Sequence, residues 1–456
     1  MRDMKLAASK RIILGSLLVA LSVPALQAKW HWAVENPLQG AFTSAPNPTL
    51  SVAALLDNSF QPQLERYLED RIGFRSWLIR LRNDLSLTLF HVARSSELVV
   101  GRNLVLFQPN AIKSYQGEDF VGEEEIRFQA KRLREVQQAL AQRHIPMLFV
   151  LAPSKARFQP EDLPDYFRPR AGQPSNYAVF LKHFRAQGLP VLDAGVLLRR
   201  WKDTTRYALF PNGGTHWSAY GAALIADTLF RRVEQLGRFD LAGFRRVGPP
   251  VVRTDNLRKT DADLSGPLNL LRPFPAQPAA YPTVVFDSLR SGQQRPNLLL
   301  VGDSFAWQFM LFAPYLQTLF APESRFWYYN TTVFLFRDEY TLEGHKPQQL
   351  NLEQEIKSRQ FLLFVVAEHN LAERGFGFVD DLYRLYFPYS AAELAHIQEL
   401  ERGLSQLPQH EQRLWQEVNA GQHTLADELH QEAIRRYDRV RSQDSRPPTS
   451  AQPTGT

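Results

Sequence analysis

The 456-residue chain contains no cysteine. Disulfides, thiolate zinc sites and cysteine nucleophiles are therefore excluded. A chain without cysteine is compatible with an oxidising or a reducing compartment, so this absence does not decide where the protein resides. After the N-terminal region, the sequence also has no second apolar run of membrane-spanning length.

The chain has little excess charge of either sign. Its formal net charge is +6, and removing a leader of net charge +3 leaves +3 on the remainder. This small excess is not clustered, so the sequence gives little support for nucleic-acid binding. It is compatible with an acidic polysaccharide ligand but does not by itself argue for one.

The N-terminus has the pattern of an export signal. A positively charged segment precedes Ile12–Leu26, a run of 15 uncharged and mostly apolar residues, and small residues at Ala25 and Ala28 offer cleavage points. The run is shorter than the roughly 20 residues of a membrane span, which favours a cleaved signal over an uncleaved anchor. Either alternative predicts export, and we expect a periplasmic protein.

Composition and apolar periodicity along the chain predict five regions. The predicted regions are a signal peptide or signal anchor (1–28), an irregular and helical segment (29–94), a catalytic domain (95–375) with an insertion at about 237–295, a helical extension (376–441) and a disordered tail (442–456). Leucines at near-helical spacing over 63–90 predict two helices separated at Gly73. Residues 99–109 suggest a hairpin of short strands.

Strands and helices alternate in the third region. This order predicts an α/β fold, with a flavodoxin-like parallel sheet covered by helices on both faces. The strands are expected at Ile145–Pro153, Leu189–Gly195, Asn297–Val301, Arg325–Tyr329 and Phe361–Ala367, and the main helices at 123–142, 177–187, 217–236, 305–320 and 350–359. The insertion has no clear periodicity.

Ser304 follows the strand 297–301 in the segment Gly302-Asp303-Ser304. Ligands of parallel sheets bind beyond the carboxyl ends of the strands, and a serine at the start of the next helix would lie beside free backbone amides. These amides suit a developing oxyanion. The alternative is that Asp303 or Ser304 is an ordinary helix N-cap.

Other strand ends and loops carry polar side chains that could assist Ser304. His216, in "FPNGGTHWSAYGA", could act as the base that a serine nucleophile needs, and His369 is a rival base. Asn370, at the end of "FVVAEHN", could donate to an oxyanion. Lys155 could bind an anionic group, although a solvated loop charge is the simpler interpretation. No metal site is predicted.

These segments together resemble the alginate O-acetyltransferase-like branch of the SGNH hydrolases. The resemblance covers roughly residues 95–375 and rests on "VVGRNLVLFQPNAIKSYQG", "VLAPSKARFQPEDLP", "THW…YGA", "GDSF" and "VVAEHN", in that order. It implies a Ser/His/Asp site with permuted motif order, in an exported protein that needs no cofactor. It also implies acetyl transfer to an exopolysaccharide, beside a membrane-bound O-acyltransferase and other assembly proteins.

One position departs from the pattern of that family. Its usual motif is Asp-x-His, but the residue two before His216 is Gly214. Another acid would have to orient the imidazole, and the candidates are Asp193, Asp303 and Glu368, with a backbone carbonyl as a further possibility. The acid therefore stays open, while Ser304 and His216 are the predicted catalytic pair.

Three functions are compatible with this sequence. The favoured one is an O-acetyltransferase that acts on a secreted polysaccharide through an acetylated Ser304. A carbohydrate acetyl esterase would use the same residues, with water as the acceptor. A catalytically weak polysaccharide-binding scaffold is the third, and Gly214 in place of an acid is the main argument for it.

Overall fold

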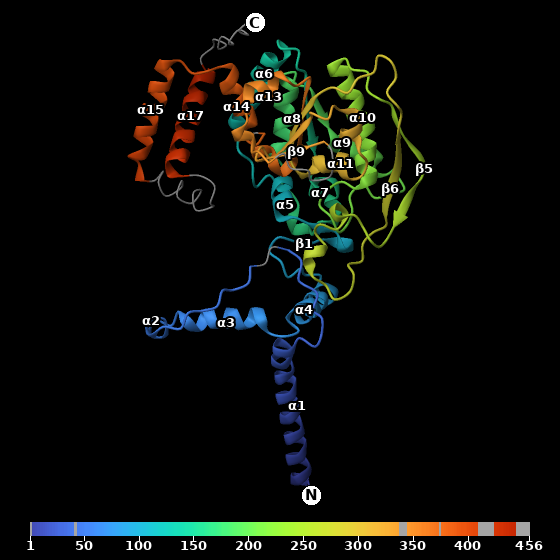
Figure 1. The fold of residues 1–456 in the computed structure, drawn as a ribbon, viewed down its shortest axis with the longest axis vertical. Coiled ribbons are helices and arrows are strands. Elements are labelled where there is room, and N and C mark those ends of the chain that lie inside the picture. The colour runs from blue at the N-terminus through green and yellow to red at the C-terminus, as the bar shows by residue number, and fades with distance from the viewer. Residues whose placement is uncertain (1, 41–42, 337–343, 374, 409–423, 444–456) are drawn as a thin grey trace.

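A computed structural model describes residues 2–40, 43–336, 344–373, 375–408 and 424–443 of the protein. Its centre is a six-stranded sheet in which five strands are parallel and β9 is antiparallel to β8 (Figure 1). Across the sheet the strands are β4 (Val191–Asp193), β3 (Met147–Ala152), β10 (Phe361–Ala367), β7 (Leu298–Gly302), β8 (Arg325–Tyr328) and β9 (Thr332–Leu335). The predicted α/β fold with a parallel sheet is confirmed.

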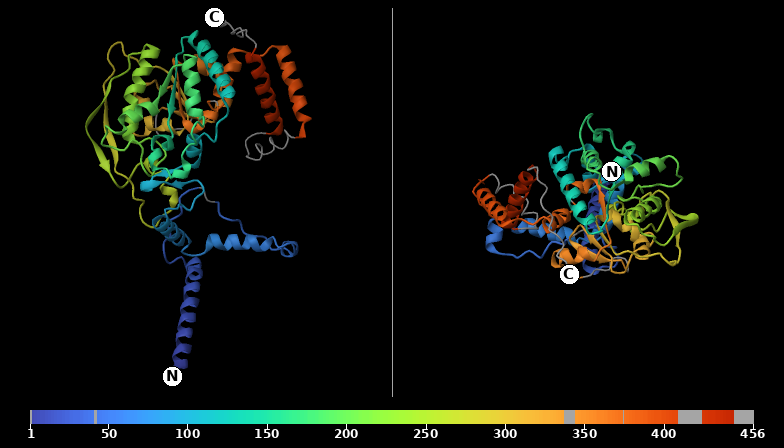
Figure 2. Two further views of the ribbon diagram at one scale, coloured as in Figure 1. Left: turned by 180° about the vertical axis from the view of Figure 1, so that it is seen from behind. Right: turned by 90° about the horizontal axis from the view of Figure 1, so that it is seen from above.

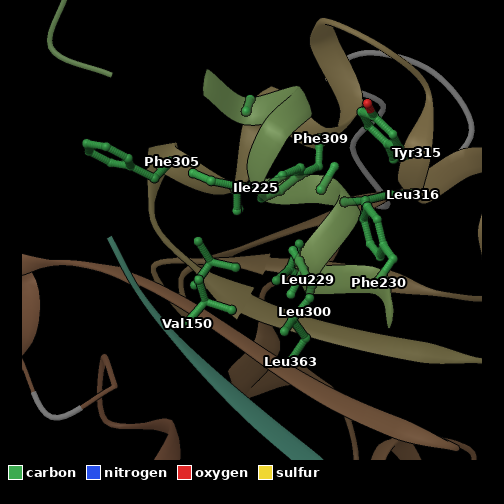
Figure 3. Close-up of a cluster of buried hydrophobic side chains, with 14 of the residues drawn as sticks. Val150, Ile225, Leu229, Phe230, Leu300, Phe305, Phe309, Tyr315, Leu316 and Leu363 are labelled. Carbon is green, nitrogen blue, oxygen red and sulfur yellow. The ribbon is translucent and has the colours of Figure 1, made fainter. Parts of the chain in front are cut away.

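The three central strands are apolar along their whole length because both faces are covered. Every residue of β3, β7 and β10 is buried. One face packs on α9 (Ala194–Lys202), α10 (Ala219–Gly237), α11 (Gln308–Leu311) and α12 (Tyr315–Leu319), and the other on α6 (Glu123–Ala141), α8 (Asn176–Ala186), α13 (Leu352–Lys357) and α14 (Phe378–Tyr386). Figure 3 shows the first of these cores, with Ile225 and Leu229 of α10 above Val150, Leu300 and Leu363 of the strands.

One sequence prediction about this domain is wrong, and two features of it were not predicted. The helix expected at 305–320 is a 3-10 turn (Ser304–Trp307) followed by α11 and α12, which are separated by Pro314. The insertion contains a long antiparallel hairpin, β5 (Phe244–Arg253) and β6 (Ala279–Phe286), which the sequence did not predict. Its pattern is hidden because Pro249 and Pro250 interrupt β5 and the register shifts there. The short strand β9 was also missed.

Small elements lie around the carboxyl edge of the sheet. The predicted hairpin is present as β1 (Val99–Val100) and β2 (Leu106–Phe107), and α5 (Pro109–Gln116) follows it. The short helix α7 (Lys155–Phe158) begins directly after β3. Short 3-10 helices occupy Arg102–Leu104, Pro160–Asp162, Asp165–Phe167, Lys259–Asp261, Gly266–Leu268, Pro347–Gln349 and Glu368–Glu373.

Helices extend the chain on both sides of this domain. On the N-terminal side are α1 (Arg2–Trp30), α2 (Val52–Leu56), α3 (Phe60–Arg71) and α4 (Arg75–Phe90), with the expected break at Gly73. Of the helices that the structure describes, α1 is the one long and apolar enough to cross a membrane. On the C-terminal side α15 (Ala391–Ser405) packs on α17 (Leu425–Gln443) through a small apolar cluster (Figure 2). Most of the predicted disordered tail lies outside the described residues.

Candidate active site

Ser304 lies at the carboxyl end of β7, as predicted. The preceding residue, Asp303, is fully buried and accepts hydrogen bonds from the backbone amides of Phe305 (3.0 Å) and Ala367 (2.6 Å). Asp303 is thus the N-cap of the turn and also ties it to the end of β10. Ser304 is left half-buried, as the first residue of the turn. Its N–H group therefore has no acceptor within the turn.

His216 is held by the packing of its neighbours in the loop before α10. Trp217 is fully buried and its ring lies edge-on to Phe305, 5.1 Å between ring centroids. Ser218 caps α10 by accepting from the Gly221 amide and donates to the Ala208 carbonyl. The imidazole of His216 also contacts the Phe305 ring at 4.9 Å. The residue after the serine therefore helps to fix the position of the histidine.

The two predicted partners meet. His216 Nε2 lies 2.8 Å from Ser304 Oγ, and His216 Nδ1 lies 2.6 Å from Asp263 Oδ2. A carboxylate can only accept, so the proton of a neutral imidazole lies on Nδ1 and Nε2 is free to accept the serine hydroxyl proton. This serine–imidazole–carboxylate chain has the connectivity of a catalytic triad. Of the two candidate bases, His216 is therefore the one that is hydrogen-bonded to Ser304.

None of the three acids predicted from the sequence occupies the Nδ1 side of His216. Asp193 caps α9 and accepts from the Tyr177 hydroxyl. Glu368 is fully buried and bonds Arg157 and Ser154. Asp303 has the capping role described above. The prediction of the acid is therefore corrected to Asp263, which sequence reasoning missed because it lies 47 residues after His216 in an insertion without periodicity.

The structure explains why position 214 has no acid. A Cβ atom at Gly214 would lie 2.5 Å from the Thr260 carbonyl oxygen and 2.9 Å from the Asp261 carbonyl carbon. The segment that carries Asp263 fills this space and is fastened to the histidine loop. The Leu264 and Ser265 amides donate to the Gly213 carbonyl, and the Thr215 amide donates to Asp263 Oδ1 at 2.8 Å. Glycine at position 214 indicates that the carboxylate partner of His216 must come from another segment, but it does not indicate which residue supplies it.

A second buried carboxyl lies two residues from Asp263. Asp261 is 1% exposed and accepts from the Tyr281 hydroxyl at 2.6 Å. Burial raises the pKa of Asp261 to about 6, against the lowering effects of the Tyr281 hydrogen bond and of Arg258. The charge of Asp263 also contributes to raising this pKa, so the two carboxyl groups interact electrostatically.

Asn370 and Tyr329 lie close to Ser304 and Asp303. Asn370 donates one amide hydrogen to Asp303 Oδ2 at 2.8 Å, and its side chain also hydrogen-bonds Tyr329. The backbone of Tyr329 is left-handed, with φ of 51°. Burial and the charge of Asp303 raise the pKa of Tyr329, whereas hydrogen bonds with Ser304 and Asn370 lower it. Asn370 is thus connected to Ser304 through Asp303 and Tyr329.

His369, the other candidate base, is buried beside the site. Its ring centroid lies 6.4 Å from that of Phe305, and burial lowers the pKa of His369.

Lys155 is buried as well. It is only 2% exposed, and its ammonium group donates to the carbonyls of Leu106 (2.9 Å) and Asn212 (3.3 Å). Burial lowers the pKa of Lys155 to about 7. Lys155 is therefore neither a solvated loop charge nor an exposed anion site; it joins β2 to the histidine loop.

Comparisons with known proteins identify a family and relatives that the chain resembles. Residues 98–323 match the family described as an SGNH hydrolase-like domain of the acetyltransferase AlgX. This segment therefore resembles the alginate O-acetyltransferase-like family. It contains Ser304, His216 and Asp263, and ends before Asn370.

Among curated proteins, the chain is 27% identical over 297 residues to the probable alginate O-acetylase AlgJ of Pseudomonas aeruginosa, covering 61% of this chain and 72% of that protein. Solved structures that it resembles include the O-acetyltransferase domain of Pseudomonas putida AlgJ, with a TM-score of 0.41, 18% identity, and coverage of 63% of this chain and 99% of that one. For Pseudomonas aeruginosa AlgX the TM-score is 0.38 and the identity is 17%, with coverage of 62% of this chain and 67% of that one. These superpositions are too loose to support a structural argument about individual residues.

Proposed function

We propose that this protein is an O-acetyltransferase that moves acetyl groups onto the hydroxyls of a secreted polysaccharide. The observation that carries the proposal is the single imidazole of His216, which bridges a serine hydroxyl and a carboxylate. The probable activity of the AlgJ relative and the family of the domain point to the same chemistry. A serine activated in this way attacks acyl groups and does not require a cofactor.

In the first half-reaction, Ser304 Oγ attacks the carbonyl carbon of an acetyl donor while its proton moves to His216 Nε2. The new imidazolium is stabilised by Asp263, whose Oδ2 accepts from Nδ1. The Ser304 amide and the side-chain amide of Asn370 stabilise the oxyanion. The donor's leaving group then takes the proton from His216 and departs, which leaves acetyl-Ser304.

In the second half-reaction a sugar hydroxyl attacks the acetyl carbonyl carbon. Its proton moves to His216 Nε2, and collapse of the tetrahedral intermediate breaks the bond to Ser304 Oγ, which recovers that proton. The polysaccharide leaves as an O-acetyl ester and the enzyme returns to its starting state. We further propose a periplasmic location, with a membrane-bound O-acyltransferase as the source of acetyl groups and other exopolysaccharide assembly proteins as neighbours.

The argument for an inactive scaffold has lost its support. It rested on Gly214, but Asp263 supplies a carboxylate to His216 from another segment. An acetyl esterase would use the same residues with water in place of the sugar. No contact of the described residues favours water over a sugar hydroxyl, so the acceptor is decided by experiment.

Acetyl-enzyme trapping tests the proposal. The full chain is incubated with an activated acetyl ester, and the Ser304 peptide is examined by mass spectrometry, in the wild type and in Ser304→Ala, His216→Ala and a control, Ser95→Ala, at a remote loop. Acetylation of Ser304 in the wild type and control, with none in the Ser304 and His216 variants, is expected. Undiminished acetyl incorporation in Ser304→Ala would overturn the mechanism. Adding an unacetylated polysaccharide then separates transfer from hydrolysis by its product.

A further inference from the structure

The amphipathic helix α4 directs leucine side chains to the outside and buries polar side chains, the reverse of the usual arrangement in a globular protein. Four leucines at helical spacing face outward: Leu78, Leu81, Leu85 and Leu89 are 42–64% exposed. The buried residues of the helix are mostly polar: Ser76, Asn83, Asp84 and Ser86, together with Leu87. Asn83 donates to the Leu268 carbonyl, and Asp84 forms an ion pair with Arg272 at 2.8 Å. We call the outward stripe Leu78–Leu81–Leu85–Leu89 the leucine face of α4. A contiguous exposed apolar stripe of this kind marks an interaction surface.

The candidate membrane helix α1 ends against the start of α4. The Gly73 amide donates to the Pro24 carbonyl at 3.2 Å, and a Cβ atom at Gly73 would lie 2.4 Å from that oxygen. Gln27, 1% exposed, donates to the Ala33 carbonyl and to Glu35. Glu35 in turn accepts from the Phe74 amide at 2.7 Å. The end of α1 is therefore built into the fold.

These contacts argue that α1 stays attached. Cleavage after Ala25 would remove the Pro24 carbonyl, and cleavage after Ala28 would also remove Gln27. The apolar part of α1 spans 19 residues, Ile12–Trp30, or about 28 Å of helix, close to the roughly 30 Å hydrocarbon thickness of a bilayer. A retained α1 would cross the membrane and emerge near Trp30.

A chain of aromatic rings marks the level at which α1 ends. Trp30, Trp32, Phe74 and Trp77 follow one another at centroid distances of 6.0–6.4 Å, and the three tryptophans are each about half exposed. Tryptophan is enriched where proteins cross the boundary between water and lipid. Trp77 joins this ring chain directly to the leucine face of α4. The aromatic chain and the leucine face are therefore one continuous apolar surface.

The neighbouring helix α3 has the orientation expected of a helix that lies along a bilayer surface. Figure 1 shows α3 crosswise to α1, between α1 and the α/β domain, and the view from behind in Figure 2 agrees. At the far end of α3, the short helix α2 exposes Val52 (75%) and Leu56 (79%). We infer that the leucine face of α4, with α2, rests in the lipid headgroup region of the bilayer that a retained α1 would cross.

This arrangement would bring the candidate active site near the membrane. On its inner side α4 contributes Leu87 to an apolar cluster that also holds Leu106 of β2 and Leu264, the neighbour of Asp263. The helix that rests on lipid is thus packed against the segment that carries the carboxylate of the site. Acetyl groups that reach the enzyme from the membrane side would have a short path to it.

The absence of cysteine makes a direct test possible. Single substitutions Leu85→Cys and, as a matched control of equal exposure, Leu394→Cys on α15 are labelled with an environment-sensitive fluorophore. The full chain is reconstituted in vesicles of phosphatidylethanolamine and phosphatidylglycerol, with and without a lipid that carries a quencher near its headgroup. We expect several-fold quenching and a blue shift at position 85, and neither at position 394.

Two outcomes would overturn the inference. The first is a label at position 85 that the lipid quencher does not reach in these protein-free vesicles, which would assign the leucine face to a protein partner. The second is an isolated membrane-derived chain that begins after Ala25 or Ala28, as determined by mass spectrometry of the intact protein. Neither result bears on acetylation of Ser304, so failure of this inference is distinguishable from failure of the proposed function.

Discussion

Asp263 Oδ2 lies 2.6 Å from His216 Nδ1, although the two residues are 47 positions apart. The other oxygen of the same carboxylate accepts from the Thr215 amide, so the carboxylate holds both the ring and the backbone next to it. A carboxylate on this nitrogen selects the tautomer that lets Nε2 act as a base. The family pattern supplies this group two residues before the histidine, and here the insertion supplies it.

The first prediction concerns the carboxylate. Asp263→Asn should lower kcat by about 10⁴-fold, because an amide can hold the wrong tautomer of His216 and cannot balance the imidazolium charge. The rate of acetyl transfer from an activated ester measures the effect. Asp255→Asn, an exposed residue of the same insertion, is the matched control and should retain full activity. A loss of less than 10-fold in Asp263→Asn would remove Asp263 from the mechanism.

The second prediction concerns the position that the family pattern gives to the acid. The double variant Gly214→Asp/Asp263→Ala should stay as inactive as Asp263→Ala alone. A side chain at 214 meets the Thr260 carbonyl, so the new carboxylate displaces the loop before it can reach the ring. Gly214→Asp alone should lower the melting temperature, measured by thermal denaturation. Recovery of activity in the double variant would contradict this account of the steric exclusion.

The third prediction concerns the oxyanion. Asn370→Ala should reduce kcat by about 10²–10³-fold with little change in KM, because the lost hydrogen bond is made to the charge of the transition state. Steady-state kinetics with a small acetyl ester separates the two parameters. If KM rose while kcat stayed constant, Asn370 would be a substrate-binding residue instead.

The fourth prediction follows from the buried carboxyl of Asp261. Because its pKa is raised to about 6 in the folded protein, the folded state holds this proton more tightly than the unfolded state. The group therefore stabilises the fold at about pH 4 and loses this contribution as pH rises through about 6, at a cost of about 1–3 kcal/mol. Asp261→Asn has no such titration. The melting temperature of the variant minus that of the wild type should increase from pH 4 to pH 7; a constant difference would contradict the prediction.

The fifth prediction separates positioning from substrate binding at Lys155. Its ammonium group joins Leu106 to Asn212, four residues before His216. Lys155→Met should lower kcat by about 10- to 100-fold by displacing the histidine loop. The ratio of kcat/KM for anionic and neutral acceptors should not change, because Lys155 does not reach solvent. Lys113→Met, an exposed lysine nearby, is the control, and a selective loss of anionic acceptors in Lys155→Met would restore the role of an anion site.

Local sequence was enough to predict five of the six strands of the sheet and the position of Ser304 at its edge. Apolar runs without alternation, such as Phe361–Ala367, specify strands buried on both faces wherever they lie in the chain. Gly302-Asp303-Ser304 after such a run fixed the serine at the carboxyl edge, and the loop around His216 could be identified from its own residues. The break at Gly73 was also visible, since it lies between two leucine-rich segments.

Tertiary structure decided which charges meet. Asp263 reaches His216 only because the insertion folds back over Gly214, and nothing in the spacing of Asp261 or Asp263 distinguishes them from the other acids of the chain. Lys155 is buried because β2 and the histidine loop, distant in sequence, enclose it. The orientation of α4 likewise depends on distant residues, because Leu268 and Arg272 bind the polar side chains Asn83 and Asp84 on its inner face. Periodicity reports which residues share a face, whereas contact between distant segments depends on how the whole chain packs.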